Sequence, residues 1–203
     1  MILLSKRVFG PLSWLCVFGV ITASLAAGAV YKTYDCEYFS VEYPSDWDVE
    51  KKVSIANEGW VYNFGDFVSV TIGRNARAVT YVVPASYMEN DSIFGENVIH
   101  FFETLNIKTG RDRQPLEDVG AHKTLENLFF SLEYPDDWLS PSPDVNTIRG
   151  TIVYTLIPRG DPSNMVALTI LEDAVAFRLQ TDRKGNIFSS PAKHIVDTLK
   201  FKY

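Results

Sequence analysis

Apolar and polar residues alternate in two short segments of the chain that have nearly the same sequence. In residues 39–43, phenylalanine, valine and tyrosine alternate with serine and glutamate, and residues 130–134 follow the same pattern. Alternation with a period of two predicts a β-strand with one buried face. Pro44 and Pro135 then end these strands, because proline has no N–H to donate to a neighbouring strand. Aromatic and β-branched residues predict six further strands, at Trp60–Phe64, Val68–Ile72, Arg77–Val83, Ile152–Ile157, Val166–Leu171 and Val175–Gln180.

The apolar spacing changes near the end of each half of the chain. Two sets of apolar residues are spaced i, i+3, i+4 and i+7, namely Val98, Phe101, Phe102 and Leu105, and Ala192, Ile195, Val196 and Leu199. This spacing predicts a short amphipathic helix in each half. Ser190 is the predicted N-cap of the second helix, with Pro191 as its first residue. A short closing strand is expected after each helix, at Asn106–Lys108 and at Lys200–Lys202.

The two halves carry similar segments in the same order. Residues 38–47, YFSVEYPSDW, and residues 129–138, FFSLEYPDDW, are identical at seven of ten positions, and residues 100–108 resemble residues 194–202. We interpret this similarity as an internal duplication. Each unit is then an antiparallel β-meander with one helix packed on its buried face, which is an α+β design.

The duplication predicts a first repeat at residues 30–110, a linker at 111–124 and a second repeat at 125–203. The linker lies within a polar connector, Thr109–Asn127. Units of this size are marginally stable alone, because their surface is large relative to their core. We therefore expect the halves to pack together, either as one continuous sheet or with sheet edges side by side.

The repeated pattern F-S-[VL]-E-Y-P-x-D-W resembles the opening of PsbP-like domains, and the closing T-L-x-[IF]-K after a short helix resembles the end of such domains. PsbP is an extrinsic subunit of photosystem II, and similar modules occur in exported bacterial proteins. The resemblance implies an antiparallel sheet flanked by helices and an accessory, non-enzymatic role. It implies no binding or catalytic residue. Each half is shorter than a usual module, and the chain lacks the basic character of the photosystem subunit.

Residues 1–29 are predicted to be a signal peptide. Lys6 and Arg7 precede an uncharged stretch, Leu12–Val30, and Ala27-Gly28-Ala29 fits the small-residue pattern before a cleavage site. The alternative is an uncleaved anchor at residues 8–30, since the nineteen uncharged residues lie within the range of about 17–25 that spans a bilayer. We expect a periplasmic or extracellular protein. After cleavage Cys36 is the one remaining cysteine, so no intrachain disulfide is expected.

Composition excludes several classes of function. The 203 residues include 19 Lys and Arg against 25 Asp and Glu, a net charge of −6, and no basic block, so a nucleic-acid partner is not expected. The sequence contains no G-x-G-x-x-G, Walker A or G-x-S-x-G motif, so no cofactor is predicted and catalysis is disfavoured. The favoured hypothesis is an exported, non-catalytic binding or accessory module that acts through a protein or envelope partner. The alternatives are a small-ligand carrier with an aromatic pocket between the repeats and, third, a hydrolase.

The three histidines are the residues best suited to metal or ligand chemistry. His100 and His194 occupy equivalent helix positions, away from the apolar stripe, and His122 lies in the predicted linker. The first two could share a metal or ligand site across a pseudo-two-fold axis. However, no second His or Cys lies four residues away and no C-x-x-C is present, so we predict partly exposed histidines without a metal.

Other candidate residues are given structural interpretations, and no catalytic, cofactor-binding or metal-binding residue is predicted. The repeated carboxylates fit a solvated strand face and turn capping better than an acid–base or calcium site; they are Glu42, Glu133, Asp46, Asp136 and Asp137. The clustered aromatic residues fit a core better than a groove; they are Tyr31, Tyr34, Tyr38, Trp60, Tyr62 and Phe64. Arg159-Gly160-Asp161 is interpreted as a turn and Asn90-Asp91-Ser92 as a glycosylation sequon, which has meaning only in a eukaryotic secretory route.

Overall fold

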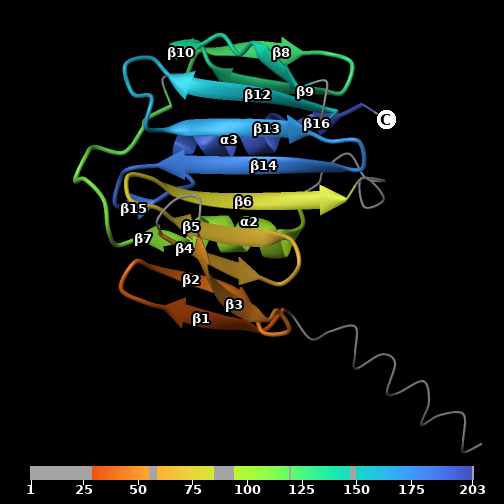
Figure 1. Ribbon diagram of the computed structural model, residues 1–203. Helices are drawn as coiled ribbons and strands as arrows, with labels where there is room; N and C mark the ends of the chain where they lie inside the picture. Colours follow the sequence, from red (N-terminus) through yellow and green to blue (C-terminus); the bar gives the residue numbers. More distant parts are fainter. Residues whose placement is uncertain (1–28, 55–58, 85–93, 119, 147–149, 203) are drawn as a thin grey trace, which may run out of the picture. The chain divides into compact units, whose positions relative to one another are not determined.

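The computed structural model describes residues 29–54, 59–84, 94–118, 120–146 and 150–202. The chain from Tyr31 onward forms one unit, separate from the first thirty residues, and only this unit is described. Its described part contains antiparallel sheets and two helices, so the fold belongs to the α+β class, as predicted (Figure 1). The predicted signal peptide, residues 1–29, lies almost entirely outside the described residues. Within the described ranges neither helix is long and apolar enough to cross a membrane.

The largest sheet has nine strands and draws on both halves of the chain. The strands are β3 (Val49–Ser54), β4 (Gly59–Phe64), β5 (Val68–Ile72), β6 (Arg77–Pro84), β10 (Trp138–Leu139), β11 (Pro143–Asn146), β12 (Thr151–Pro158), β13 (Met165–Ile170) and β14 (Ala174–Thr181). Their order is β10-β12-β13-β14-β6-β5-β4-β3, and β11 also pairs with β12. The six strands predicted from aromatic and β-branched residues are confirmed within this sheet. β6 pairs with β14 along its whole length, so the strands of the two halves form one continuous sheet.

Two smaller sheets hold the remaining strands. One has the order β1-β2-β7-β15 and the other has the order β16-β9-β8. Their strands are β1 (Tyr31–Asp35), β2 (Phe39–Pro44), β7 (Asn106–Ile107), β8 (His122–Glu126), β9 (Phe130–Pro135), β15 (Gly185–Asn186) and β16 (Lys200–Phe201). β2 and β9 are the strands predicted from alternation, and β7 and β16 are the predicted closing strands. β15 comes from the second half of the chain but pairs with β7 from the first half.

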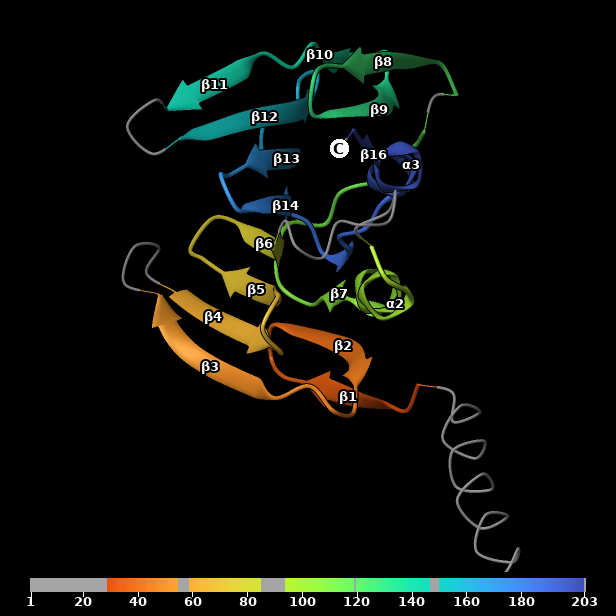
Figure 2. The same cartoon turned by 90° about the vertical axis from the view of Figure 1, so that its right-hand side faces the viewer.

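Helices α2 (Glu96–Thr104) and α3 (Ser190–Thr198) lie on the same face of the nine-stranded sheet (Figures 1 and 2). The apolar stripe predicted for each helix is buried, with Phe101 and Phe102 of α2 and Ile195 of α3 fully shielded from solvent. α2 packs against β2 and α3 packs against β9. The helices therefore fill the space between the large sheet and the two small sheets.

Aromatic rings join the cores of the two halves. Phe102 of α2 lies with its ring centroid 6.2 Å from that of Phe177 in β14 and 5.5 Å from that of Phe188, just before α3. Phe94 lies 5.1 Å from Phe177 in an edge-to-face arrangement. Aromatic pairs at these separations add to the stability gained from burial alone. The interior is thus one hydrophobic cluster that extends across the β6–β14 junction.

The start of α3 corrects one sequence prediction. Ser189, not Ser190, is the N-cap residue, and its side chain makes no capping hydrogen bond. The helix begins one residue earlier than predicted because the Lys193 N–H donates to the Ser189 carbonyl at 2.9 Å, which makes Ser190 helical. Pro191 still lies in the first turn, where its missing N–H removes no helical bond.

Several edge strands were not predicted. β8 lies within the segment predicted as a polar connector, and β1, β3 and β11 had no clear apolar alternation. The residues of β8, HKTLE, are partly or fully exposed, so the strand has little apolar pattern. Whether 110/111 and 124/125 are the repeat boundaries stays a prediction.

We expect a fragment truncated after Gly110 to aggregate or to stay unfolded. Such a fragment lacks β14, so β6 loses its partner strand and Phe94 and Phe102 lose the aromatic rings that cover them. The measurement is thermal unfolding of the fragment and of the full chain, followed by circular dichroism. A cooperative transition of the fragment alone would show that the first half holds together without the second.

Candidate functional site

Two histidines lie at matching positions and each contacts a glutamate on the strand below its helix. His100 Nε2 of α2 lies 2.8 Å from Glu42 Oε2 of β2, and His194 Nε2 of α3 lies 3.2 Å from Glu133 Oε2 of β9. The histidine side chains are 31% and 27% exposed, so they lie at the boundary that the helix pattern predicts. His100 and His194 belong to different clusters and do not share one site.

A threonine fixes each helix to its strand. The Glu42 N–H donates to Thr104 Oγ1 at 3.1 Å, and the Thr104 hydroxyl donates to the His100 carbonyl at 2.9 Å. Thr198 makes the same two bonds in the second half, with the Glu133 N–H at 2.9 Å and the His194 carbonyl at 2.9 Å. Each histidine is therefore held at a set position above its glutamate.

His122 distinguishes the second half from the first. It opens β8 opposite Pro135, and its ring stacks on that of His194 with centroids 3.7 Å apart and an interplanar angle of 15°. Tyr31 has the corresponding place in the first half, at the start of β1 opposite Pro44, and its ring lies 3.9 Å from that of His100. A tyrosine–histidine contact in one half is thus a histidine–histidine contact in the other.

Asp118 adds a carboxylate to the two stacked histidines. It lies in the loop before β8, with Oδ1 3.0 Å from His122 Nε2. The Gly120 N–H donates to the same Asp118 oxygen at 2.9 Å. That backbone hydrogen bond is the largest cause that lowers the pKa of Asp118, partial burial opposes it, and the neighbouring His122 and His194 lower it further. The charged carboxylate is therefore favoured at this position.

Asp118, His122 and His194 form a donor set that is suited to a divalent metal ion. Each offers one ligand atom, and these atoms all lie within 4.8 Å of one another. Two imidazoles and a carboxylate suit Zn²⁺ and related first-row ions. With bonds of about 2.0–2.2 Å, the ligand atoms around zinc lie no more than about 4 Å apart. The two rings are stacked, so at least one of them would have to turn out of that arrangement for both to bind one ion, and Glu133 beside His194 is placed to orient that ring.

This cluster was not predicted from the sequence. No second His or Cys lies four residues from any of the histidines, and Asp118 and His122 come from a loop and an edge strand in the predicted linker. Recognition of the edge strand would have provided the missing information, because pairing of β8 with β9 brings His122 beside the strand that carries Glu133.

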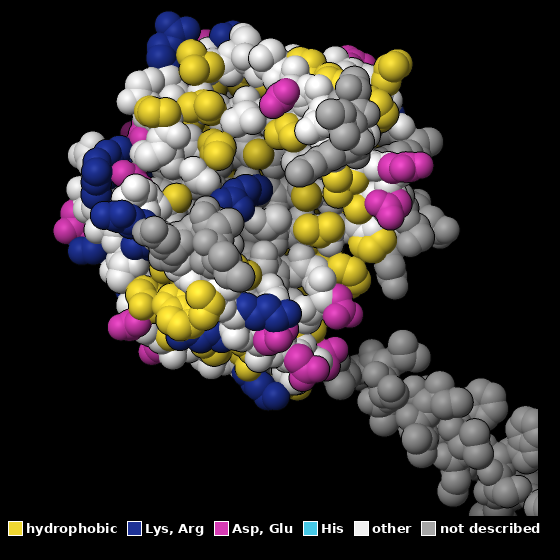
Figure 3. All heavy atoms as spheres, in the orientation of Figure 1, with side chains coloured by type: hydrophobic (Ala, Val, Ile, Leu, Met, Phe, Trp, Pro, Cys, Tyr) yellow, Lys and Arg dark blue, Asp and Glu magenta, His cyan; other side chains and the backbone are white. Residues whose placement is uncertain are grey.

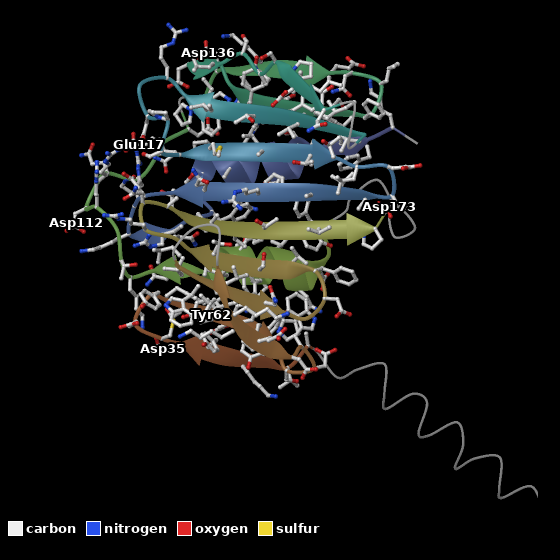
Figure 4. All side chains as sticks on the ribbon, viewed as in Figure 1. Asp35, Tyr62, Asp112, Glu117, Asp136 and Asp173 are labelled. Carbon is white, nitrogen blue, oxygen red and sulfur yellow. The ribbon has the colours of Figure 1, made fainter. Side chains whose placement is uncertain are left out.

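The other candidate residues have structural roles that match their interpretation. Tyr62 and Phe64 are buried, and burial of Tyr62 is the main cause that raises the pKa of its hydroxyl (Figure 4). The remaining aromatic candidates, Tyr31, Tyr34, Tyr38 and Trp60, are half-buried. Asp46, Asp136 and Asp137 are exposed at turns or strand ends. Cys36 is a free, partly buried thiol 3.5 Å from the Phe39 carbonyl.

The two short motifs differ in outcome. Arg159-Gly160-Asp161 lies at the turn after β12, as predicted, with Gly160 at a positive φ of 80°. The Asp161 carboxylate is engaged inside the protein, because it pairs with Arg113 and Arg183. The sequon Asn90–Ser92 lies outside the described residues.

No protein-family model matches the chain, and no curated protein matches it significantly. The likeness to PsbP-like domains therefore depends on the sequence motifs alone.

We expect Asp118→Asn to destabilise the protein at neutral pH and to have less effect in acid. The pKa of Asp118 is lower in the folded protein than its unfolded value of about 3.9, so its stabilising contribution is present above that value and is lost as the pH falls through the folded pKa. The measurement is the free energy of unfolding in urea from pH 7 down to pH 3. Asp137→Asn, at an exposed carboxylate, is the control, and an Asp118→Asn penalty that is independent of pH would contradict the expectation.

Proposed function

We propose that this protein is an exported, non-catalytic binding or accessory module of the PsbP-like kind, which acts through a protein or envelope partner. The sequence motifs and the α+β class support this proposal. A tandem arrangement of two repeats is part of it. The matching Glu42–His100–Thr104 and Glu133–His194–Thr198 arrangements favour that view, since the same hydrogen bonds connect helix and strand in both halves.

The observation that carries the proposal is the open face of the nine-stranded sheet, meaning the face that neither of the two described helices covers. Both helices lie on the opposite face, so neither of them covers it (Figures 1 and 2). Side chains that alternate with the buried residues of β5, β6, β12, β13 and β14 point to this face, and most are short and uncharged: Ser69, Thr71, Thr80, Thr155, Thr169 and Ala176. Interfaces are depleted of charge at their centre, so this composition favours contact with a protein partner.

One cation lies among these short side chains. Arg178 of β14 donates through Nη1 to Thr80 Oγ1 at 3.3 Å and through Nη2 to Gln180 Oε1 at 3.2 Å. Burial of the guanidinium lowers the pKa of Arg178. Figure 3, which views this face, shows hydrophobic patches, with most acidic and basic side chains towards the edges. A fixed arginine inside an otherwise uncharged surface favours a partner with a complementary acidic group.

We expect a photoreactive residue in place of Thr71 to crosslink the full chain to one discrete protein in cells of the native organism. The matched control places the same residue at Glu103, an exposed position on α2. The captured protein is then purified, and its affinity for the chain is measured by calorimetry. Arg178→Glu should weaken that affinity at least about tenfold, with an unchanged melting temperature. Equal capture from both positions, or none from Thr71, would overturn the proposal.

A second function is favoured by the approach of Asp118, His122 and His194. We infer that the second half binds a divalent ion of the zinc type at these residues. Ligating imidazoles must be neutral, so the affinity should fall as the pH decreases through the histidine range. The first half has Tyr31 where the second has His122, so its His100–Glu42 pair lacks the second imidazole.

Zinc titration by calorimetry should detect one site per chain, and His122→Tyr should weaken it at least about 100-fold. This substitution gives the second half the tyrosine that the first half has, so the metal-free protein should keep its melting temperature. His100→Gln is the matched control and should keep zinc binding. Retention of the site in His122→Tyr, or its loss in His100→Gln, would contradict the assignment.

A further inference from the structure

A cavity of about 270 Å³ lies where the segment after the first half meets the start of α3. Its walls come from residues 113–116, the end of β14, the segment around β15 and the first residues of α3. The lining does not include the histidine cluster or the open sheet face. This cavity is therefore separate from both sites discussed above.

The cavity lining is basic although the chain is acidic overall. Arg113, Arg183 and Lys184 line it, and no Asp or Glu is among the lining residues, whereas the whole chain has a net charge of −6. These cations come from two different segments of the chain that both line the cavity. Arginine forks match the geometry of phosphate and carboxylate oxygens.

Carboxylates behind the lining hold the cations in place. Asp161 pairs with both arginines, at 3.1 Å from Arg113 Nη1 and in a close contact with Arg183 Nη2. Asp182 lies 3.4 Å from Arg113 Nη2, and Asp112 lies 3.2 Å from Lys184 Nζ. With Arg111, which lies 3.7 Å from Asp182, the network has four cations for three carboxylates, which leaves one positive charge in excess.

The pKa of Asp161 reflects this environment. Burial would raise the pKa, but hydrogen bonds from Ser163 and Arg183 and the arginine charge lower it below its ordinary value. Asp161 is therefore a charged anchor for the arginines, and Arg183 Nε is left without an acceptor.

Two buried donors at the cavity have no acceptor. Asn164 is only 4% exposed, and its Oδ1 accepts a hydrogen bond from the Thr181 hydroxyl at 2.6 Å. The Asn164 amide is directed at the Asp161 carboxylate and helps to lower its pKa, although Nδ2 makes no hydrogen bond of good geometry. Arg183 Nε also makes none. Buried polar groups without partners are rare in native proteins. A ligand oxygen that enters the cavity could accept a hydrogen bond from such a donor.

The N-terminus of α3 opens onto the same cavity. Ser189 and Ser190 are lining residues, and the Ser189 side chain makes no capping hydrogen bond. The first N–H groups of a helix have no partner within the helix, and the helix dipole favours an anion there. Of these groups the Ser190 N–H belongs to a lining residue, whereas Pro191 in the same turn has no N–H to offer.

We propose that this cavity binds the phosphate group of a small molecule or free phosphate, held by Arg113, Arg183, Lys184 and the start of α3. Donors from several segments suit a tetrahedral oxyanion, which has acceptor oxygens in several directions. The basic lining disfavours cationic ligands by charge repulsion. The site does not depend on the partner surface or on the histidine cluster, so its failure leaves both earlier proposals intact.

The test is calorimetry on the full chain with inorganic phosphate and with glycerol 3-phosphate, and with glycerol as the uncharged probe. We expect saturable binding of one or both phosphates and none of glycerol. Arg113→Gln and Asn164→Asp should each weaken it at least about tenfold, the second because it places a carboxylate where the unpartnered donor lies. Tighter binding of the ester points to a phosphorylated small molecule, and equal binding points to free phosphate.

Lys52→Gln is the matched control, since it removes one positive charge from an exposed position on β3, outside the lining. It should leave phosphate binding unchanged, which separates a built site from general attraction to cations. Melting temperatures without phosphate show whether each variant is folded. No saturation up to about 10 mM phosphate, or equal weakening in Lys52→Gln and Arg113→Gln, would overturn the proposal.

Discussion

The aromatic contact between α2 and β14 is the interaction on which the rest of the structure depends. Phe102 touches Phe177 and Phe188, and Phe94 touches Phe177, directly below the ladder between β6 and β14. Each half is a small unit with a large surface relative to its core, so a cluster shared by both halves buries more apolar surface than either would alone. The shared cluster covers the sheet strands of both halves. It also fixes the path of the chain before α3. Phe188 is anchored in the cluster, which places the start of α3 and the neighbouring cavity.

The elements that could be predicted from the sequence are those in which the spacing of apolar residues follows the buried face. Alternation identified β2 and β9, and the i, i+3, i+4, i+7 spacing identified both helices, because each has a distinct apolar face. β8 was missed for the opposite reason. An edge strand whose residues are all partly or fully exposed has little apolar periodicity. β8 is defined by its pairing with β9, which the local sequence pattern does not show.

The candidate site was missed for the same physical reason. His194 could be placed on a helix from the sequence, but its neighbours could not, because Asp118 and His122 reach it only through the β8–β9 register. The cavity next to α3 was beyond sequence analysis as well. Arg113 and Arg183 are far apart along the chain, and only their common partner Asp161 shows that they converge.

The two halves differ in the ring that contacts the matched histidine. The same glutamate, histidine and threonine arrangement is present twice, and the ring that stacks on the histidine is Tyr31 in one half and His122 in the other. A phenol adds packing and one hydrogen bond, to Asn97 at 2.9 Å, whereas an imidazole adds a metal-ligating nitrogen. Under the repeat hypothesis and the proposed metal site, the same framework supports packing in one copy and metal binding in the other.

The pairing of β6 with β14 has a consequence for how the protein is made. Arg77 of β6 lies opposite Thr181, so the two partners in this ladder are separated by about half of the chain. Contacts between distant residues form slowly, because a long loop must close first. A growing polypeptide therefore exposes the edge of β6 until synthesis has passed Thr181, and an exposed strand edge readily pairs with other chains. The edge of β6 therefore has to be protected from other chains while the protein is being synthesised.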